Sequence, residues 1–377
     1  MVRDTMNILF FLPNSLLYGG GEENWLIEVG NRLAQKGHNI IIITLSYTPI
    51  VRACSVKLTK GIRHEECPYL KLPRGCALPS LFTMAKMVKL ANEVDVVYIF
   101  AVHPPNELLL RILKPSIKRP IIIGIHSVPY RFVMTERVYI TLLKHLLDFS
   151  TAFHVPIRYT EFILKRWGYE NVYRIPNGVD ISEFRLCDDP ANSSTFNILF
   201  TGRIEHSKGV DILIKLIHII NKEKNMRDAN FLICGSGSLD HIVRRVADQY
   251  DNVKFLGFIP RKELISVYRK SHLFLVPSRE EQMPLRLLEA QACGLPAVAS
   301  KIFGISDVIS TCKSGEMIAI NNIYGFIESI KRYCEMWHQH PDRYYEMCKR
   351  IRSCIIKNYS WSSVIKRLEN MLKNIAG

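Results

Sequence analysis

The chain has 377 residues, of which 48% are hydrophobic and 23% are charged. This length predicts two globular domains, because single domains usually hold roughly 100–200 residues. The longest apolar runs, 39–45 and 94–102, have the length of strands and fall short of the roughly 18 residues that a membrane-spanning helix needs. We therefore expect that the chain is not an integral membrane protein. The start MVRDTMNILFFLPNS lacks a signal-peptide core, so we expect a cytoplasmic protein.

The net charge of +15 is distributed unevenly. Residues 51–150 carry 15 Lys or Arg against 7 Asp or Glu, an excess of 8 positive charges. Such an excess favours an anionic partner, such as nucleic acid, acidic lipid head groups or a phosphorylated substrate, and the simpler alternative is a basic soluble surface. The basic residues come with no recognised nucleic-acid-binding motif and no aromatic platform, so we expect no nucleic-acid partner.

The 10 cysteines form no CxxC pair and no zinc-ribbon spacing. We expect most of them to be reduced and structural. Cys54, His64, Cys67 and Cys76 have the residue types of a metal site but irregular gaps. The sequence therefore predicts no metal ion and no bound cofactor.

Apolar strands alternate with helical segments along the chain. The first half opens with a strand at 7–13, a glycine-bearing loop at 18–21 and an amphipathic helix at 22–36. The second half repeats this order with the strand 196–201, the loop 202–209 and a helix from about Val210. Further strands are predicted at 39–45, 96–100, 121–125, 231–234, 253–255, 273–276 and 297–300.

These strands lack the alternation of polar and apolar residues that a half-exposed sheet shows. Such strands, separated by helices, are typical of doubly wound parallel sheets, so we expect an α/β protein with two Rossmann-like domains. The polar segment 187–195 (CDDPANSST) predicts the boundary. We expect an N-terminal domain at 1–187, a C-terminal domain at 188–357, and a final helix at 358–377 that packs on the N-terminal domain. Substrates would then bind in a cleft between the domains, beyond the carboxyl ends of the strands.

The segment 276–300 (VPSREEQMPLRLLEAQACGLPAVAS) carries the strongest chemical signal. Pro284 is placed to occupy the first position of a helix, where its missing N–H costs no hydrogen bond. The free backbone amides of Leu285 and Arg286 then form an anion site at the start of that helix.

Two glutamates bracket this anion site. Glu281 precedes the helix and Glu289 lies two turns later. They are able to bind the two ends of an extended ligand whose phosphates contact the amides between them. The alternative is an ordinary solvated helix start, which favours acidic residues anyway.

With its flanking residues, the Glu281 and Glu289 pair resembles the E-x(7)-E motif of the family 4 retaining glycosyltransferases of the GT-B fold. Other landmarks of that family follow in order: GGGEE (19–23), GH (37–38), His126, IPNGVD (175–180), GR-x(4)-KG (202–209), CGSG (234–237), FLGFI (255–259) and YSW (359–361). The resemblance implies two Rossmann-like domains that face each other across a cleft. It also implies metal-independent transfer of a hexose-type sugar from a UDP- or GDP-sugar to a hydroxyl group, with the anomeric configuration retained.

The resemblance also implies roles for individual residues. Arg203 and Lys208 match the basic pair that binds the donor diphosphate and neutralises its growing charge, although each is also explicable as a surface charge. Glu281 matches the glutamate that contacts sugar hydroxyls, and Glu289 matches the ribose-binding glutamate. The other positions expected at the donor are Gly20 and Gly21 in the N-domain loop, and Gly235, Gly257, Phe258, Leu285 and Arg286.

His126 follows the predicted strand 121–125 and is expected at the carboxyl edge of a sheet. It matches the family histidine that lies beside the transferred sugar, so we expect it to be catalytic together with Arg203, Lys208 and Glu281. His103, which also follows a strand, is the rival candidate, and a structural role is the alternative for either histidine.

The sequence departs from the family directly after the first glutamate. Gln282, Met283 and Pro284 stand where many members carry glycine-phenylalanine-glycine, which bears on the identity of the sugar. Arg286 either adds a phosphate contact or points to solvent. A nucleotide-sugar epimerase of the GT-B fold and a non-catalytic nucleotide-sugar-binding scaffold are the alternative functions. A dehydrogenase is disfavoured, because neither YGGG nor CGSG completes a GxGxxG motif.

The acceptor, a glycan or a lipid-linked molecule, is expected on the N-terminal domain, which holds the basic excess. The segment 78–94 mixes apolar residues with Lys86 and Lys89. It is either a helix in a membrane interface or an amphipathic helix that covers the sheet. Further basic clusters at 57–63 and 111–119 favour peripheral contact with the anionic inner face of a membrane.

Overall fold

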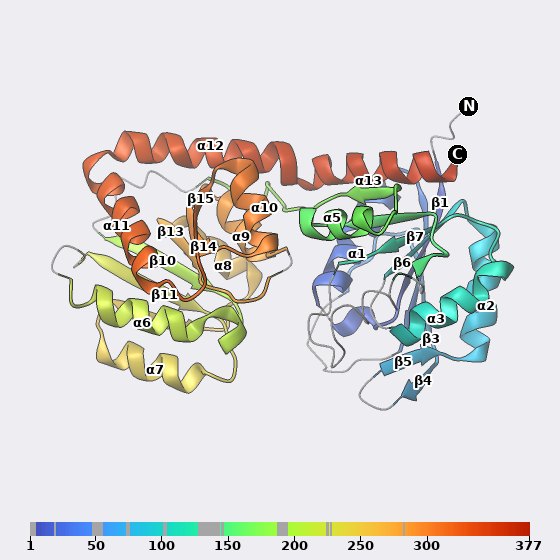
Figure 1. Cartoon of the computed structure of the whole chain (residues 1–377), viewed down its shortest axis with the longest axis horizontal. Coiled ribbons are helices and arrows are strands. Elements are labelled where there is room, and N and C mark those ends of the chain that lie inside the picture. The colour runs from blue at the N-terminus through green and yellow to red at the C-terminus, as the bar shows by residue number, and fades with distance from the viewer. Residues whose placement is uncertain are drawn as a thin grey trace. The chain divides into compact units, whose positions relative to one another are not determined.

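The computed structural model describes residues 5–18, 20–46, 56–72, 76–100, 104–126, 144, 147–186, 195–223, 226, 228–281 and 283–377. The chain divides into two compact units, Met1–Pro176 with Ile365–Gly377 and Asn177–Val364 (Figure 1). The division falls inside IPNGVD rather than in the polar segment expected to hold it, of which 187–194 lie outside the described residues. Arg352 explains this position, because its guanidinium donates to the backbone carbonyls of Ile181 and Phe184 and so ties them to the second unit.

The first unit is built on a seven-stranded sheet with the order β3-β2-β1-β6-β7-β8-β9. Every pair of neighbouring strands is parallel. The strands are β1 (Asn7–Leu12), β2 (Asn39–Leu45), β3 (Arg63–Cys67), β6 (Val96–Phe100), β7 (Ile121–Gly124), β8 (Ala152–Val155) and β9 (Val172–Arg174). A separate antiparallel hairpin pairs β4 (Tyr69–Leu72) with β5 (Cys76–Pro79).

Helices pack on both faces of this sheet. They are α1 (Gly21–Gln35), α2 (Leu81–Glu93), α3 (Pro104–Leu113) and α5 (Arg158–Arg166), with short 3₁₀ turns η1 (Leu16–Tyr18) and η3 (Lys114–Ser116). Successive side chains of a strand point to opposite faces. Leu9 and Phe11 of β1 therefore join the core beneath α2, while Phe10 packs near Tyr98. Tyr98 in turn contacts Trp25 of α1.

Helix α2 resolves the two interpretations of the segment 78–94. Met87, Leu90 and Ala91 are buried in the core of the unit, so the helix covers the sheet. Leu81 and Phe82 at its first turn are 79% and 66% exposed. One end of α2 thus presents apolar side chains to solvent.

The second unit holds a six-stranded sheet with the order β12-β11-β10-β13-β14-β15, again with all neighbours parallel. The strands are β10 (Phe196–Thr201), β11 (Ala229–Cys234), β12 (Val253–Gly257), β13 (Leu273–Val276), β14 (Ala297–Ser300) and β15 (Gly315–Ile318). The helices are α6 (Val210–Ile220), α7 (Asp240–Gln249), α8 (Arg261–Arg269), α9 (Leu285–Ala292), α10 (Phe303–Cys312), α11 (Ile323–Gln339) and α12 (Pro341–Tyr359), with the 3₁₀ turn η5 (His206–Lys208). The two sheets confirm the prediction of two Rossmann-like domains.

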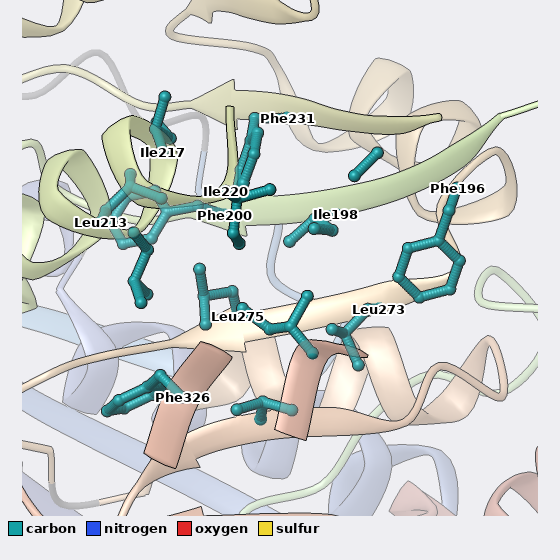
Figure 2. Close-up of a cluster of buried hydrophobic side chains, with 14 of the residues drawn as sticks. Phe196, Ile198, Phe200, Leu213, Ile217, Ile220, Phe231, Leu273, Leu275 and Phe326 are labelled. Atoms are coloured by element: carbon teal, nitrogen blue, oxygen red, sulfur yellow. The ribbon is translucent and has the colours of Figure 1, made fainter. Parts of the chain in front are cut away.

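The core of the second unit lies between its sheet and the helices on one face. Leu213, Ile217 and Ile220 of α6 belong to one cluster with Phe200 of β10 and Phe231 of β11 (Figure 2). All five side chains are almost fully buried. This packing fixes α6, and so fixes the loop that precedes it at the carboxyl end of β10.

Helix α13 (Trp361–Ala376) crosses the division between the units, which falls after Val364. Within the first unit, its Glu369 accepts a hydrogen bond from Lys36 at 2.7 Å and lies 3.4 Å from His38. The GH landmark at 37–38 is therefore part of the contact that holds the C-terminal segment in the first unit.

The cysteines show one feature that the sequence did not predict, a disulfide between Cys312 of α10 and Cys354 of α12. Free and buried cysteines include Cys67, Cys234, Cys293, Cys334 and Cys348. Cys54 lies outside the described residues. Within the described parts of the chain, no three His, Cys, Asp or Glu side chains gather as a metal site would require. No helix in those parts is both long and apolar enough to cross a membrane.

Candidate donor and sugar sites

The loops after β10 and β13 hold the residues with the strongest sequence signal. In the sheet of the second unit, β10 and β13 are neighbours, and the chain builds outward from this pair in both directions. Ligands of open α/β sheets bind at this switch point, beyond the carboxyl ends of the strands. Arg203 and Lys208 follow β10, and Glu281 follows β13.

Lys208 and Glu281 form an ion pair that joins the two loops. The Nζ atom of Lys208 lies 2.5 Å from Oε1 of Glu281, and both side chains are largely buried. Gly209 allows this approach, because it has a φ of +72° and a Cβ there would lie 2.0 Å from the carbonyl oxygen of Pro277. The hydroxyl of Ser278 donates to the same carboxylate at 3.3 Å. The GR-x(4)-KG and E-x(7)-E motifs thus meet in one cluster.

Arg203 lies at the exposed side of the same edge. Its NH1 is 2.9 Å from Glu205, and its side chain is 55% exposed. A flexible, exposed cation at this position is free to turn toward a ligand, since its pairing with Glu205 is a surface contact of small energy.

The loops after β11 and β12 touch the loop after β10. Gly235 lies so close that a Cβ would be 1.8 Å from the carbonyl oxygen of Gly202. The amide of Gly235 donates to the carbonyl oxygen of Gly257 at 2.7 Å. Phe258, which follows Gly257, is 73% exposed. The structure therefore brings Gly235, Gly257 and Phe258 to the same sheet edge as Arg203.

Helix α9 begins one residue later than the sequence predicted. Pro284 is the N-cap residue, with φ −71° and ψ 106°, so it is extended and does not occupy the first helical position. Its carbonyl accepts the first helical bonds, from the amides of Leu287 and Leu288 at 3.1 and 3.3 Å. The amides of Leu285 and Arg286 precede these bonds, and no side chain caps the helix. The two amides that the sequence predicted to bind an anion therefore lie at the start of the helix, before its first hydrogen bonds. Gln282 lies outside the described residues.

Glu289 is only 5% exposed and is held by three neighbours. Its Oε2 accepts from the Tyr268 hydroxyl at 3.0 Å and from Arg286 at 2.8 Å, and Arg261 lies 3.9 Å from Oε1. Burial is the largest single effect and would lower the pKa of Arg286, but the charge of Glu289 and the hydrogen bonds to Glu289 and Tyr268 together raise it. Burial, followed by the Glu289 charge, raises the pKa of Tyr268 well above its usual range.

Arg286, for which the sequence left open a phosphate contact or a solvent-exposed side chain, pairs with Glu289. Tyr268 and Arg261 were not identified from the sequence. A tyrosine among the buried positions of α8 was the available signal for the first of them.

In the first unit, His126 lies two residues beyond β7 and is partly buried. Its Nε2 is 2.9 Å from the hydroxyl oxygen of Tyr98, and the Trp25 ring centroid is 4.6 Å from its own. Burial, with a smaller effect of His154, lowers the pKa of His126 well below its usual range. The rival histidine, His103, lies outside the described residues.

The glycine loop leads into the same region of the first unit. Gly20 is the N-cap of α1 and accepts a hydrogen bond from the Asn24 amide at 3.1 Å. Gly21 opens the helix, and a Cβ there would meet no atom within 4 Å. Trp25, one turn later, contacts His126. Gly19 lies outside the described residues.

Two parallel α/β sheets, each with polar loops at its carboxyl edge, are the architecture of the GT-B fold, which the glycosyltransferases of this class share. A model of glycosyltransferase family 4 matches residues 19–183, and a model of glycosyl transferases group 1 matches residues 188–352. The chain belongs to the family 4 glycosyltransferases of the GT-B fold. The resemblance noted in the sequence is confirmed.

Named relatives agree with this assignment. A subunit of the phosphatidylinositol N-acetylglucosaminyltransferase of Arabidopsis thaliana is 23% identical over 96% of this chain and 79% of that protein. A GDP-mannose-dependent monoacylated alpha-(1-6)-phosphatidylinositol monomannoside mannosyltransferase of Corynebacterium glutamicum is 26% identical over 81% of this chain and 84% of that protein. The structure of Anabaena HepE in complex with UDP has a TM-score of 0.75 at 16% identity, over 98% of this chain and all (100%) of that one. This last likeness supports the fold.

Proposed function

We propose that the protein transfers a hexose-type sugar from a UDP- or GDP-sugar to a hydroxyl group of its acceptor and retains the anomeric configuration. The observation that carries this proposal is the cluster in the second unit, where Lys208 contacts Glu281 at the switch point. Cations, free helix amides and buried carboxylates gathered at one edge are what a nucleotide diphosphate linked to a polyhydroxyl sugar needs.

Each group has a part in binding the donor. Arg203, Lys208 and the amides of Leu285 and Arg286 bind the diphosphate, because all of them present positive charge or N–H groups. Glu289 accepts hydrogen bonds from the ribose hydroxyls, and Tyr268 with Arg286 fixes its orientation. When the diphosphate binds Lys208, the carboxylate of Glu281 becomes available to the sugar hydroxyls.

In the proposed mechanism, positively charged side chains stabilise the transition state, and no protein nucleophile takes part. As the bond from the sugar to the phosphate breaks, negative charge grows on the leaving diphosphate, and Arg203 with Lys208 neutralises it. The leaving phosphate takes the proton of the acceptor hydroxyl on the same face, which retains the configuration. His126 contacts the transferred sugar. Because protein cations supply the neutralisation, we propose that no metal ion is needed.

The acceptor we propose is a phosphatidylinositol-type lipid, since both named relatives carry phosphatidylinositol in their names. The first unit has features that suit a lipid surface. Leu81 and Phe82 of α2 and Ile112 of α3 are exposed, and both helices pack against β5. Together with the basic excess of residues 51–150, these side chains support peripheral attachment to an anionic membrane.

The test is a transfer assay with purified protein and vesicles that contain phosphatidylinositol. A panel of UDP- and GDP-sugars is added one at a time, and the lipid products are identified by mass spectrometry. We expect one donor to increase the lipid mass by one hexose-type residue, and the Lys208→Ala variant to lose most of this product. The same assay is run with glycan acceptors in place of the vesicles, and a product found only there would show that the proposed lipid acceptor is wrong. No product with any donor would contradict the proposal.

A further inference from the structure

A chain of hydrogen bonds leads from His126 into the interior of the first unit. His126 Nε2 is 2.9 Å from the Tyr98 hydroxyl oxygen, which is 2.5 Å from His154 Nδ1. His154 Nε2 is 2.8 Å from the carbonyl oxygen of Ile175. Tyr98 and His154 are completely buried on strands that are otherwise apolar. The sequence motifs included neither residue.

The direction of each hydrogen bond follows from whether the group at each end is able to donate or to accept. The carbonyl of Ile175 only accepts, so Nε2 of His154 carries a proton. Burial lowers the pKa of His154 to about 4, so at neutral pH its ring has no second proton and Nδ1 accepts. The Tyr98 hydroxyl must therefore donate to His154. Burial raises the pKa of Tyr98 well above its usual range, which keeps that proton in place.

The same reasoning determines which ring nitrogen of His126 carries the proton. The only proton of the Tyr98 hydroxyl is used toward His154, so its oxygen accepts from His126. Nε2 of His126 therefore carries the proton of the ring. Among the described residues, Nδ1 of His126 has no hydrogen-bond partner, and its lone pair is available to a ligand.

We propose that Tyr98 and His154 are positioning residues that hold His126 as the neutral Nε2–H tautomer, so that its Nδ1 accepts a hydrogen bond from a hydroxyl of the bound sugar. The hydrogen bond at one ring nitrogen determines what the other nitrogen can do. This inference rests on the proposed function in one respect, that His126 lies beside the transferred sugar. It adds the protonation state in which His126 acts and the residues that impose it.

Packing fixes the position of the Tyr98 hydroxyl between the two histidines. Gly124 on the neighbouring strand makes room for it, because a Cβ at Gly124 would lie 2.1 Å from the hydroxyl oxygen. On the other side, the Trp25 ring stacks on Tyr98 with centroids 5.7 Å apart. A tyrosine enclosed in this way cannot move its hydroxyl away from the histidines without disturbing the core.

The first arm of the test measures the tautomers directly. Long-range proton–nitrogen NMR spectra of ¹⁵N-histidine-labelled protein distinguish protonated from unprotonated ring nitrogens, with the His126 signals assigned by their loss in His126→Gln. We expect wild-type His126 and His154 to be neutral and protonated at Nε2. In Tyr98→Phe, the Nδ1-protonated tautomer of His126 should appear, because its acceptor is gone. A proton on Nδ1 of wild-type His126, or an unchanged tautomer in Tyr98→Phe, would overturn the proposal.

The second arm measures transfer. Tyr344→Phe is the matched control, since it removes a buried hydroxyl that donates to the His272 carbonyl in the other unit. We expect kcat of Tyr98→Phe to fall at least tenfold, with the donor KM changed less than about twofold, while Tyr344→Phe keeps both values. Equal kcat in the two variants would overturn the positioning role. If wild type transfers no sugar, the proposed function fails, and the NMR arm still decides the tautomer.

Discussion

Lys208 and Glu281 form an ion pair of 2.5 Å although 73 positions separate them in the sequence. The pair joins the loop after β10 to the loop after β13, at the switch point of the sheet. In the free protein the positive charge of Lys208, which we assign to diphosphate binding, and the negative charge of Glu281, which we assign to sugar binding, neutralise each other. When the donor binds, Lys208 must exchange Glu281 for the diphosphate, and Glu281 must exchange Lys208 for the sugar hydroxyls. Both side chains should therefore respond to a donor that carries the diphosphate and the sugar together.

Removal of either cation tests the diphosphate site. In Arg203→Ala and in Lys208→Ala, turnover should fall by on the order of a hundredfold, because each cation acts mainly on charge that grows in the transition state. Lys254→Ala, which changes an exposed lysine of the same unit, should keep wild-type turnover. Steady-state kinetics check this, with circular dichroism to confirm folding. Near-normal turnover in both single variants would refute the assignment.

Glu289→Gln tests the ribose site. The amide keeps the size of the side chain and an acceptor for Tyr268, but it loses the charge that binds ribose hydroxyls and pairs with Arg286. The donor KM should rise by about tenfold or more, since a hydrogen bond to a charged group contributes roughly 1.5–3 kcal/mol. Glu263→Gln on the exposed face of α8 is the control. A donor KM that is equal in the two variants would argue against ribose binding at Glu289.

Chelation tests the source of charge neutralisation. Because Arg203, Lys208 and the α9 amides are proposed to hold the diphosphate, transfer in excess EDTA should stay within about twofold of the untreated rate. The measurement is the initial rate with and without chelator, followed by addition of magnesium or manganese. Complete loss of transfer that either metal restores would instead require a metal-bridged donor.

Acid should destabilise both units through buried histidines. Burial lowers the pKa values of His154 and His272 to about 4, against about 6.5 in an unfolded chain. Between these values the unfolded state binds more protons, so the free energy of unfolding decreases as the pH falls, by about 1.4 kcal/mol per pH unit for each histidine.

Urea denaturation at a series of pH values measures this effect. The His154→Gln variant has one titrating group fewer, so its stability should depend less steeply on pH in this window than that of wild type. The slope is the relevant quantity, since the substitution also changes stability at every pH. A wild-type stability that stays constant from about pH 6.5 to about pH 4 would contradict the buried, neutral histidines.

Vesicle binding tests the proposed contact of α2 with a membrane. Wild-type protein should co-sediment with anionic but not with neutral vesicles, and high salt should release it because the attraction is screened. The double variant Leu81→Ser, Phe82→Ser should bind several-fold more weakly, since it loses exposed apolar side chains. Tyr324→Ser, which changes an exposed aromatic residue of the other unit, should bind like wild type. Equal failure of wild type to bind either kind of vesicle would favour a soluble acceptor.

Most strands made of continuous apolar runs could be predicted from the sequence, including the edge strand β12, whereas the polar edge strand β3 and the short strands β8 and β9 could not. The boundaries of β2, β6, β10, β13 and β14 agree with the prediction residue for residue, because buried parallel strands are continuous apolar runs. The sequence of β3 is RHEEC, and it lies at the edge of its sheet, where polar side chains reach solvent. Strand β9 has only 3 residues, too few to show a pattern.

The site shows the same limit at the level of side chains. The resemblance of short motifs to those of the family pointed to Lys208, Glu281 and Glu289, because each motif spans only a few neighbouring residues. The partners Tyr98 and His154 were missed, since they lie 28 and 56 positions apart from their hydrogen-bonded neighbours. A tyrosine or histidine inside an apolar strand was the available signal, because a buried polar group needs a partner.

The anomeric configuration of the product tests the central claim most directly. NMR spectra of the purified product show whether the transferred sugar has the same configuration at its anomeric carbon as the donor. The account predicts the donor configuration from a UDP- or GDP-sugar, and none of this product from the Lys208→Ala and Glu289→Gln double variant. A product with inverted configuration, or no sugar-bearing product from any nucleotide sugar, would contradict it.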